Sequence, residues 1–125
     1  MVTVRIDRAK HGIGNKGGFL FNPRTGLMCC LGFCMLKAGY NKEEIEGKVL
    51  PDDLAVYGNP VSIDSPLAEL LNNYSACEIL AAINDNITNK MSAKCREERL
   101  IKAAAEFDVK FEFYGERNGR ARKSA

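Results

Sequence analysis

The longest uncharged apolar run of the chain, Met28–Leu36, lies within Gly26–Tyr40, whose one charge is on Lys37. Apolar residues recur there at i, i+3, i+4 and i+7, the spacing of one helical face. Gly32 within the run indicates that another backbone packs closely against it, and Gly39 is suited to end a helix. The pattern therefore predicts a central helix that is buried on nearly all sides. The residues of its apolar face are Leu31, Cys34, Met35 and Ala38, with Cys30 and Phe33 beside them.

Apolar and polar residues alternate at both ends of the chain. In Val2–Ile6 the valines and the isoleucine face one way, and Thr3 and Arg5 face the other. In Asp108–Tyr114 the valine and both phenylalanines occupy alternate positions. Alternation with a period of two is typical of a half-buried strand, so we predict a first and a last β-strand here.

A turn signal precedes the central helix. Asn22–Gly26 places proline at the second turn position and glycine at the end, between the apolar stretches Phe19–Phe21 and Leu27–Cys29. This arrangement predicts a β-hairpin whose second strand continues almost directly into the central helix.

Capping residues indicate further helices. Asn41 with Glu44 three residues later predicts a short helix that ends at Gly47. Each of the remaining signals precedes residues with helical apolar spacing, so we expect two consecutive helices in the middle of the chain and one last helix. These signals are Ser65-Pro66, the capping box Ser75–Glu78, and Ser92.

These elements predict an α+β fold with a three- or four-stranded, largely antiparallel sheet and with the helices packed on one face. The sheet would consist of the first strand, the hairpin and the last strand. A length of 125 residues is typical of one domain, which we assign to residues 1–114. Residues 115–125 are basic and have nothing to bury, so we expect a flexible tail.

The composition is that of an ordinary globular protein, with 46% hydrophobic and 27% charged residues. The longest apolar run is too short to cross a bilayer, and the amino terminus carries charges where a signal peptide needs its apolar block. Five cysteines, an odd number with two adjacent, fit a reducing compartment. We therefore expect a cytoplasmic protein without disulfides that does not contact a membrane.

Charge is distributed unevenly along the chain. Residues 1–27 carry a net +4, residues 28–114 a net −5 and residues 115–125 a net +3. If the first and last strands share a sheet, the basic residues of both ends lie near one another and can hold a polyanion such as a nucleic acid. The alternative is a solvated loop and a solubilising tail. The residues concerned are Arg5, Arg8, Lys10, Lys16, Arg117, Arg120, Arg122 and Lys123.

Two motifs resemble ligand sites, but their contexts argue against both. Gly12–Gly17 matches the dinucleotide-binding fingerprint, yet a β-like run follows it in place of the required helix, so we interpret it as a glycine loop. Asn84–Asn86 resembles the start of a calcium loop, but position twelve counted from Asp85 is Arg96. The five cysteines contain no Cys-x-x-Cys pair. We therefore predict no cofactor and no metal.

Cys30 raises a catalytic alternative, because a thiol exposed near a helix amino terminus has a lowered pKa. A cysteine hydrolase also needs a histidine base, and His11 is the one histidine of the chain. His11 precedes the cysteine on a glycine-rich loop, with no evident carboxylate nearby to orient it. Free cysteine is among the most buried residue types, so we favour packing and keep a small enzyme using Cys30 and His11 as the alternative.

Gly18–Phe21 and Met28–Phe33 together resemble a pattern found in small bacteriophage and prophage proteins of no settled activity. In those proteins a β-hairpin leads into Cys-Cys-Leu-Gly, and a short acidic helix follows. The similarity extends over about Gly17–Leu54. It implies a phage or prophage gene expressed in the cytoplasm of a bacterial host, and it assigns no role to any residue.

One histidine, no tryptophan and no convincing metal or phosphate motif leave the chain poorly equipped for chemistry. We therefore expect a phage accessory protein that is not an enzyme and that binds a host protein stoichiometrically, a defence component being the suggested target. Nucleic-acid binding through the basic termini stays an alternative. A standard interface uses about 800 Å² from each partner. The residues that we expect to anchor it are Leu54, Val56, Tyr57 and Pro60.

Overall fold

The computed structural model describes residues 1–13, 19–55, 59–85 and 91–116. Within them the chain is α+β, as its sequence patterns predict. In chain order the elements are β1 (Val2–Asp7), α1 (Cys30–Lys37), α2 (Lys42–Ile45), the 3-10 helix η2 (Pro51–Leu54), α3 (Ala68–Leu71), α4 (Tyr74–Asp85), α5 (Ala93–Ala105) and β2 (Val109–Tyr114).

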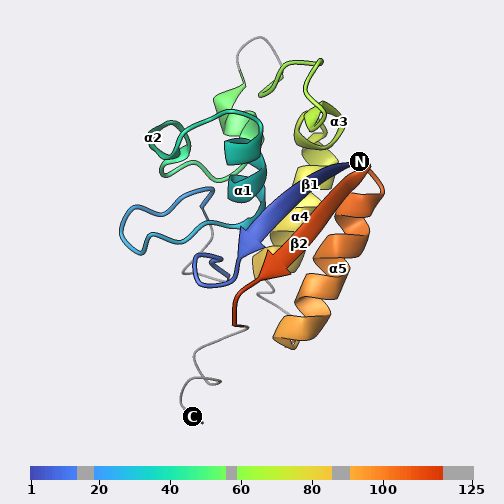
Figure 1. The fold of residues 1–125 in the computed structure, drawn as a ribbon. Coiled ribbons are helices and arrows are strands. Elements are labelled where there is room, and N and C mark those ends of the chain that lie inside the picture. The colour runs from blue at the N-terminus through green and yellow to red at the C-terminus, as the bar shows by residue number, and fades with distance from the viewer. Residues whose placement is uncertain (14–18, 56–58, 86–90, 117–125) are drawn as a thin grey trace.

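The sheet of the described residues has two strands, β1 and β2, which run parallel in the register Val2↔Val109 to Asp7↔Tyr114. Figure 1 shows both strands pointing the same way, with α4 behind them and α5 along their β2 side. The prediction of a three- or four-stranded antiparallel sheet is therefore wrong. The chain returns through its helices to the end where β1 begins, so β2 enters beside β1 in the same direction. The amino-terminal ammonium accordingly lies 3.7 Å from the Asp108 carboxylate.

The predicted hairpin is present as its turn and two backbone hydrogen bonds between its arms, from Asn22 N–H to Leu27 and from Cys29 N–H to Phe19, but its arms do not form the two predicted strands, which is a second error. Asn22 and Leu27 form a single antiparallel bridge. The arm before the turn bonds elsewhere, since the N–H of Leu20 donates to the carbonyl of Lys48 at 2.7 Å. Backbone groups used against the segment after α2 cannot also extend the sheet.

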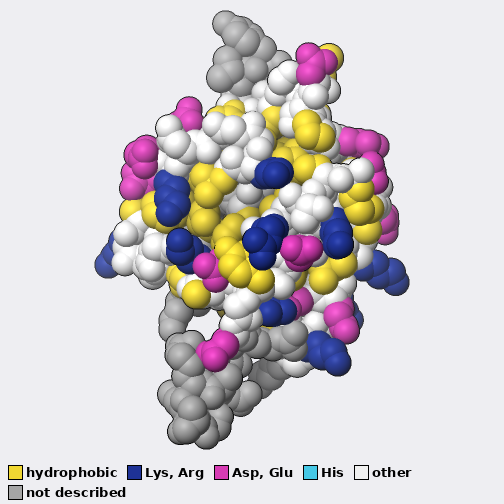
Figure 2. Space-filling model, in the orientation of Figure 1, with side chains coloured by type: hydrophobic (Ala, Val, Ile, Leu, Met, Phe, Trp, Pro, Cys, Tyr) yellow, Lys and Arg dark blue, Asp and Glu magenta, His cyan; other side chains and the backbone are white. Residues whose placement is uncertain are grey.

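The two faces of the sheet differ as the alternation predicts. The inner face packs on the helices, and its buried residues include Val4, Ile6 and Phe111. The outer face carries Arg5 and Glu112, which form an ion pair with an N–O distance of 3.0 Å. Figure 2 shows side chains of both charges together with apolar ones on the side of the molecule where Figure 1 has the two strands. One face of the sheet is therefore part of the core, and the other faces solvent.

Helix α1 lies at the centre of the core, and its residues from Cys30 to Met35 are buried. A Cβ atom placed on Gly32 would lie 1.9 Å from the carbonyl oxygen of Leu20. The close backbone contact predicted from Gly32 is thus confirmed. The helix is shorter than Gly26–Tyr40, because the residues before Cys30 are used in the turn and in an extended segment.

Two of the four predicted helix starts are correct. The helix predicted from Ser65-Pro66 begins later, at Ala68, without a side-chain cap. Asn41 and Glu44 form the capping box of α2, with hydrogen bonds of 2.9 and 3.0 Å. Ser92 caps α5. The prediction for α4 is wrong, because this helix begins two residues earlier than expected and the side chain of Asn73, not Ser75, bonds a free N–H of its first turn.

Candidate functional site

Asn84 is a fully buried polar residue near the end of α4. Its Oδ1 accepts hydrogen bonds from Nε2 of His11 at 2.6 Å and from the backbone N–H of Cys30 at 3.0 Å. Its Nδ2 donates to the carbonyl of Gly12 at 2.9 Å and to Oδ1 of Asp85 at 3.2 Å. These partners lie in the loop after β1, at the start of α1 and on α4 itself. Asn84 therefore joins three segments of the fold.

His11 takes part in this network with a half-buried imidazole. Because Nδ2 of Asn84 meets two acceptors, Oδ1 is the atom that meets His11, so Nε2 of His11 carries a proton. The imidazole centroid lies 6.3 Å from that of the Phe33 ring and 5.6 Å from that of the Phe113 ring. Burial lowers the pKa of His11, since the imidazolium loses its hydration. At neutral pH, His11 is therefore a neutral hydrogen-bond donor.

The thiols around α1 lie inside the protein. Cys30 and Cys34 are fully buried, and burial raises the pKa of both thiols well above the ordinary value. Burial also raises the pKa of Cys29, the residue before α1, to about 11. Within the described residues, His11 is linked to Cys30 through the amide of Asn84, which bonds the backbone N–H of Cys30 and not its thiol. The predicted pair Cys30 and His11 therefore lies in one network, without the exposed thiolate that nucleophilic catalysis uses.

A cavity of about 70 Å³ lies beside His11 at the start of α5. Arg8 donates from Nε and Nη2 to the two carboxylate oxygens of Glu97, both at 2.8 Å, and from Nη1 to the carbonyl of Gly115 at 2.7 Å. Arg96 is 8% exposed, and its Nε has no hydrogen-bond partner within the described residues. The described residues that line the cavity are Arg8, His11, Ile13, Ala93, Arg96 and Glu97.

The predicted polyanion site lies partly in the described residues. The first and last strands do share a sheet, as this prediction requires. The guanidinium of Arg5 bonds Glu112 and lies 4.3 Å from the centroid of the Tyr114 ring, Arg8 bonds Glu97, and Lys10 is exposed. The two arginines thus already have carboxylate partners. The other predicted contacts, Lys16, Arg117, Arg120, Arg122 and Lys123, lie outside the described residues.

The predicted protein interface is also described only in part. Leu54, at the end of η2, is half-buried. Pro60 is buried, and its carbonyl accepts a hydrogen bond from the hydroxyl of Tyr40. Val56 and Tyr57 lie outside the described residues. The interface at these four residues therefore stays a prediction.

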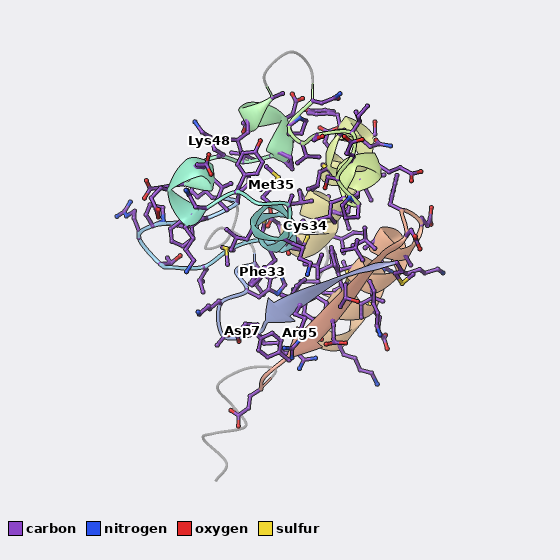
Figure 3. The ribbon with its side chains drawn as sticks, turned by 45° about the horizontal axis from the view of Figure 1, so that its top comes forward. Arg5, Asp7, Phe33, Cys34, Met35 and Lys48 are labelled. Carbon is purple, nitrogen blue, oxygen red and sulfur yellow. The ribbon has the colours of Figure 1, made fainter. Side chains whose placement is uncertain are left out.

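A groove of about 370 Å³ lies between β1 and α1. Figure 3 shows Phe33 on the side of α1 that faces β1, with Arg5 and Asp7 across the strand from it. Val4 is buried and Leu36 half-buried, so the floor of the groove is apolar, whereas Arg5 and Lys37 are exposed. The described residues that line this groove are Thr3, Val4, Arg5, Phe33, Leu36 and Lys37.

Sequence reasoning missed Asn84 and Arg96 as interior residues. A signal for both is their helical spacing from apolar positions. Asn84 follows Leu80 by four residues and Cys77 by seven, so it lies on the buried face of α4. Arg96 precedes Leu100 by four residues on α5 in the same way. A polar residue at a core position of a helix indicates a buried hydrogen-bond network or a ligand.

In the described part of the chain, no helix is long and apolar enough to span a membrane. The same residues contain no group of three or more His, Cys, Asp or Glu that could hold a metal ion. The chain matches no protein-family model, no curated protein and no solved structure. Its function is therefore inferred from geometry and charge.

Proposed function

We propose that the protein acts by stoichiometric binding and that it takes an extended, acidic segment of a partner protein as an added strand along β1. One observation carries this proposal: the outer edge of β1, which lies beside a groove, has backbone groups that no described residue pairs. An open strand edge is a template for another strand, whose main chain supplies affinity and whose alternate side chains supply specificity.

The hydrogen-bond pattern of the ladder identifies the open edge. The N–H groups of Val2 and Arg8 donate to carbonyls at the two ends of β2, at 3.3 and 2.9 Å. Residues of a parallel strand direct their backbone groups alternately to one side and the other. Thr3 and Arg5 therefore direct theirs away from β2, and both residues line the groove. Within the described residues these backbone groups have no hydrogen-bond partner.

Charge distinguishes the two edges of the sheet. The groove beside β1 has Lys37 at its rim and no carboxylate among its described lining residues, and Arg5, which also lines it, is paired with Glu112 on the outer face of the sheet. A second space, of about 310 Å³, lies between β2 and α5 and is lined by charges of both signs, including the carboxylates of Glu97, Glu98 and Glu112. Opposite charge favours association and like charge opposes it. An acidic segment is therefore expected at β1 and not at β2.

The partner class follows from the phage resemblance. A phage or prophage product meets host proteins, so the proposed partner is a host protein, with a defence component as the suggested kind. Nucleic acid is the less favoured partner, because Arg5 and Arg8 are already bonded to carboxylates within the fold.

The state of the thiols supports binding over catalysis. A thiol is a nucleophile only as its thiolate, and burial raises the pKa of Cys29, Cys30 and Cys34. These side chains are also closed to solvent. We expect Cys30→Ala to leave partner binding unchanged and Cys30 in the folded wild type to react slowly with a thiol reagent. Rapid modification of Cys30, or loss of function in a folded Cys30→Ala variant, would favour the enzyme alternative.

The groove can be tested with a defined probe. An eight-residue peptide of alternating valine and glutamate, with a valine–lysine peptide as its control, is titrated into the isotopically labelled protein. We expect the amide resonances of Thr3 and Arg5 to shift only with the acidic peptide, and Lys37→Glu to weaken binding roughly tenfold. Lys102→Glu is the matched control, because Lys102 is an exposed lysine on α5, away from the groove. Equal binding of both peptides, or no response at β1, would contradict the proposal.

The function itself needs a partner from the host. Wild type, Lys37→Glu and Lys102→Glu are used to capture proteins from bacterial lysate, and a purified candidate is then titrated against each variant. A 1:1 complex that Lys37→Glu weakens and Lys102→Glu does not supports both the function and the groove. A complex that is insensitive to Lys37→Glu keeps stoichiometric binding but places it elsewhere. A captured protein that the wild type modifies catalytically would refute stoichiometric action.

A further inference from the structure

We infer that the cavity at the start of α5 binds a phosphate-sized oxyanion, which Arg96 holds together with His11 and the first turn of α5. This site lies apart from the groove along β1, and the inference does not depend on the proposed strand addition.

Arg96 is a buried arginine in the wall of the cavity. Its side chain is more than nine-tenths buried, it lines the cavity, and its Nε has no hydrogen-bond partner within the described residues. A guanidinium stays charged at any physiological pH, and a buried charge is normally paired, because removing it from water is costly. Glu97 also lines the cavity, but both of its carboxylate oxygens accept from Arg8 at 2.8 Å. Because no described residue bonds Nε of Arg96, we expect an anionic ligand to be the counter-ion of this guanidinium.

The size and charge of the cavity fit a small oxyanion. A single water needs about 10–15 Å³ of such volume, and the cavity offers about 70 Å³. Among its described lining residues, Arg8 and Arg96 outnumber the one carboxylate, of Glu97, so the net charge is +1. Chloride can neutralise this charge, but a tetrahedral oxyanion can also accept several hydrogen bonds at once.

The start of α5 adds further donors. This helix has 13 residues, and Ala93, its first residue, lines the cavity. Ser92 bonds the N–H of Cys95 through its side chain and the N–H of Arg96 through its carbonyl, which leaves the first N–H groups of the helix available. Backbone N–H groups and the helix dipole at an amino terminus both favour a negative ligand.

His11 lines the cavity, and its imidazole can both bind an anion and provide an NMR signal for binding. Its Nε2 is used by Asn84, whereas its Nδ1 makes no hydrogen bond within the described residues. The charged groups that act on the imidazole are Glu97 and Arg96, with opposite effects. An anion in the cavity would stabilise the imidazolium through Nδ1 and raise its pKa. Because the chain has one histidine, a single imidazole signal follows this change without ambiguity.

The test uses the full chain and inorganic phosphate as the probe. Imidazole resonances of His11 are recorded by NMR while phosphate replaces chloride at constant ionic strength, and the titration is repeated with sulfate and with adenosine monophosphate. We expect a saturable shift and a higher imidazole pKa with phosphate. If adenosine monophosphate binds as well, the ligand is a phosphate group carried by a larger molecule; if only the inorganic anions bind, it is a free oxyanion. A linear, non-saturating response to phosphate would overturn the inference.

Two variants test whether Arg96 is the residue that binds phosphate. Arg96→Gln keeps hydrogen-bonding capacity and removes the charge, and we expect it to weaken phosphate binding at least tenfold. Arg99→Gln is the matched control, because Arg99 is an exposed arginine three residues further along the same helix. Equal weakening by both variants would indicate a diffuse effect of surface charge and would refute the site. Should Arg96→Gln fail to fold, the saturable response of His11 in wild type and in Arg99→Gln decides the question.

Discussion

Two buried polar groups lie beside the single imidazole, and they differ in how well they are paired. The amide of Asn84 has a hydrogen-bond partner on both its oxygen and its nitrogen, and it connects the loop after β1 to α1 and α4. The guanidinium of Arg96 lines a cavity, and its Nε has no partner within the described residues. Buried polar groups in folded proteins are normally hydrogen-bonded.

This difference in pairing indicates a structural role for Asn84 and a ligand-binding role for Arg96. A fully bonded buried network rigidifies the fold, and removing one member leaves its partners unsatisfied. A buried group without a partner in the fold costs stability unless a ligand supplies that partner. The Asn84 network and the tight packing at the start of α1 are therefore expected to be sensitive to substitution, and the Arg96 cavity to tolerate it.

The largest effect is expected at Gly32, in the closely packed part of the molecule. In Gly32→Ala the added Cβ would lie 1.9 Å from the carbonyl oxygen of Leu20, so the backbone of one of the two segments must move. We expect a loss of about 3 kcal/mol in the free energy of unfolding, measured by urea titration, although alanine has the higher helix propensity. Lys102→Ala on the exposed face of α5 is the control and should change stability by less than about 0.5 kcal/mol. A neutral Gly32→Ala would mean that α1 and the Leu20 segment are not in contact.

Asn84→Ala is expected to have the next largest effect. It leaves the N–H of Cys30, the Nε2 proton of His11 and the carbonyl of Gly12 without their partner. Each unsatisfied buried group costs about 1–3 kcal/mol, and partial relaxation reduces the sum, so we expect about 2–3 kcal/mol. The control is Asn41→Ala, which removes an exposed helix cap worth about 1 kcal/mol. Equal losses in both variants would show that the network around Asn84 contributes little.

Local features of this fold could be predicted from the sequence because each depends on neighbouring residues. The alternation in Val2–Ile6 and the capping box of Asn41 and Glu44 act over a few positions. Gly32 indicates a close backbone contact, but not that Leu20 makes it. The class of the fold and the edges of several elements follow from such signals.

The sheet and the candidate site depend on hydrogen bonds between residues far apart in the sequence, and local sequence patterns do not identify such partners. The arms of the predicted hairpin are apolar runs on either side of a turn, yet Leu20 bonds Lys48, so the local pattern does not identify the partner. Asn84 is 73 residues from His11 and 54 from Cys30. Its place on the apolar face of α4 could have indicated burial, but not the groups that it bonds.

The dependence of stability on pH tests whether the pKa of His11 is lowered in the folded protein. The pKa of His11 is lowered in the folded protein, so the unfolded chain takes up a proton first as pH falls. Stability should therefore fall as pH drops below the unfolded pKa of about 6.5, and the loss should end below the folded pKa. Burial raises the pKa of Asp85, which has the opposite effect: the folded protein takes up this proton first, so stability rises as pH falls through the folded pKa of Asp85.

Urea unfolding of wild type and of Asp85→Asn between pH 8 and 5 separates these two groups. We expect both proteins to lose stability below about pH 6.5, and a difference between them marks the part of the range over which the Asp85 carboxyl titrates. Saturating phosphate should reduce the loss if the anion stabilises the imidazolium. A flat profile for Asp85→Asn over this range would mean that His11 has the same pKa in the folded and unfolded states.

The smallest effect is expected at Arg96, where substitution should not cause the loss of stability expected of Asn84→Ala. In a chloride buffer, Arg96→Met retains an unbranched side chain of similar length and removes a buried charge whose Nε bonds none of the described residues, so stability should stay within about 1 kcal/mol of wild type or rise. Arg99→Met, at an exposed position, is the control for the change of residue type. Adding phosphate should stabilise wild type and Arg99→Met but not Arg96→Met, because only a protein that binds the anion gains from it. A loss in chloride as large as that of Asn84→Ala would place Arg96 among the residues that hold the fold together, and the contrast between the two regions would then be wrong.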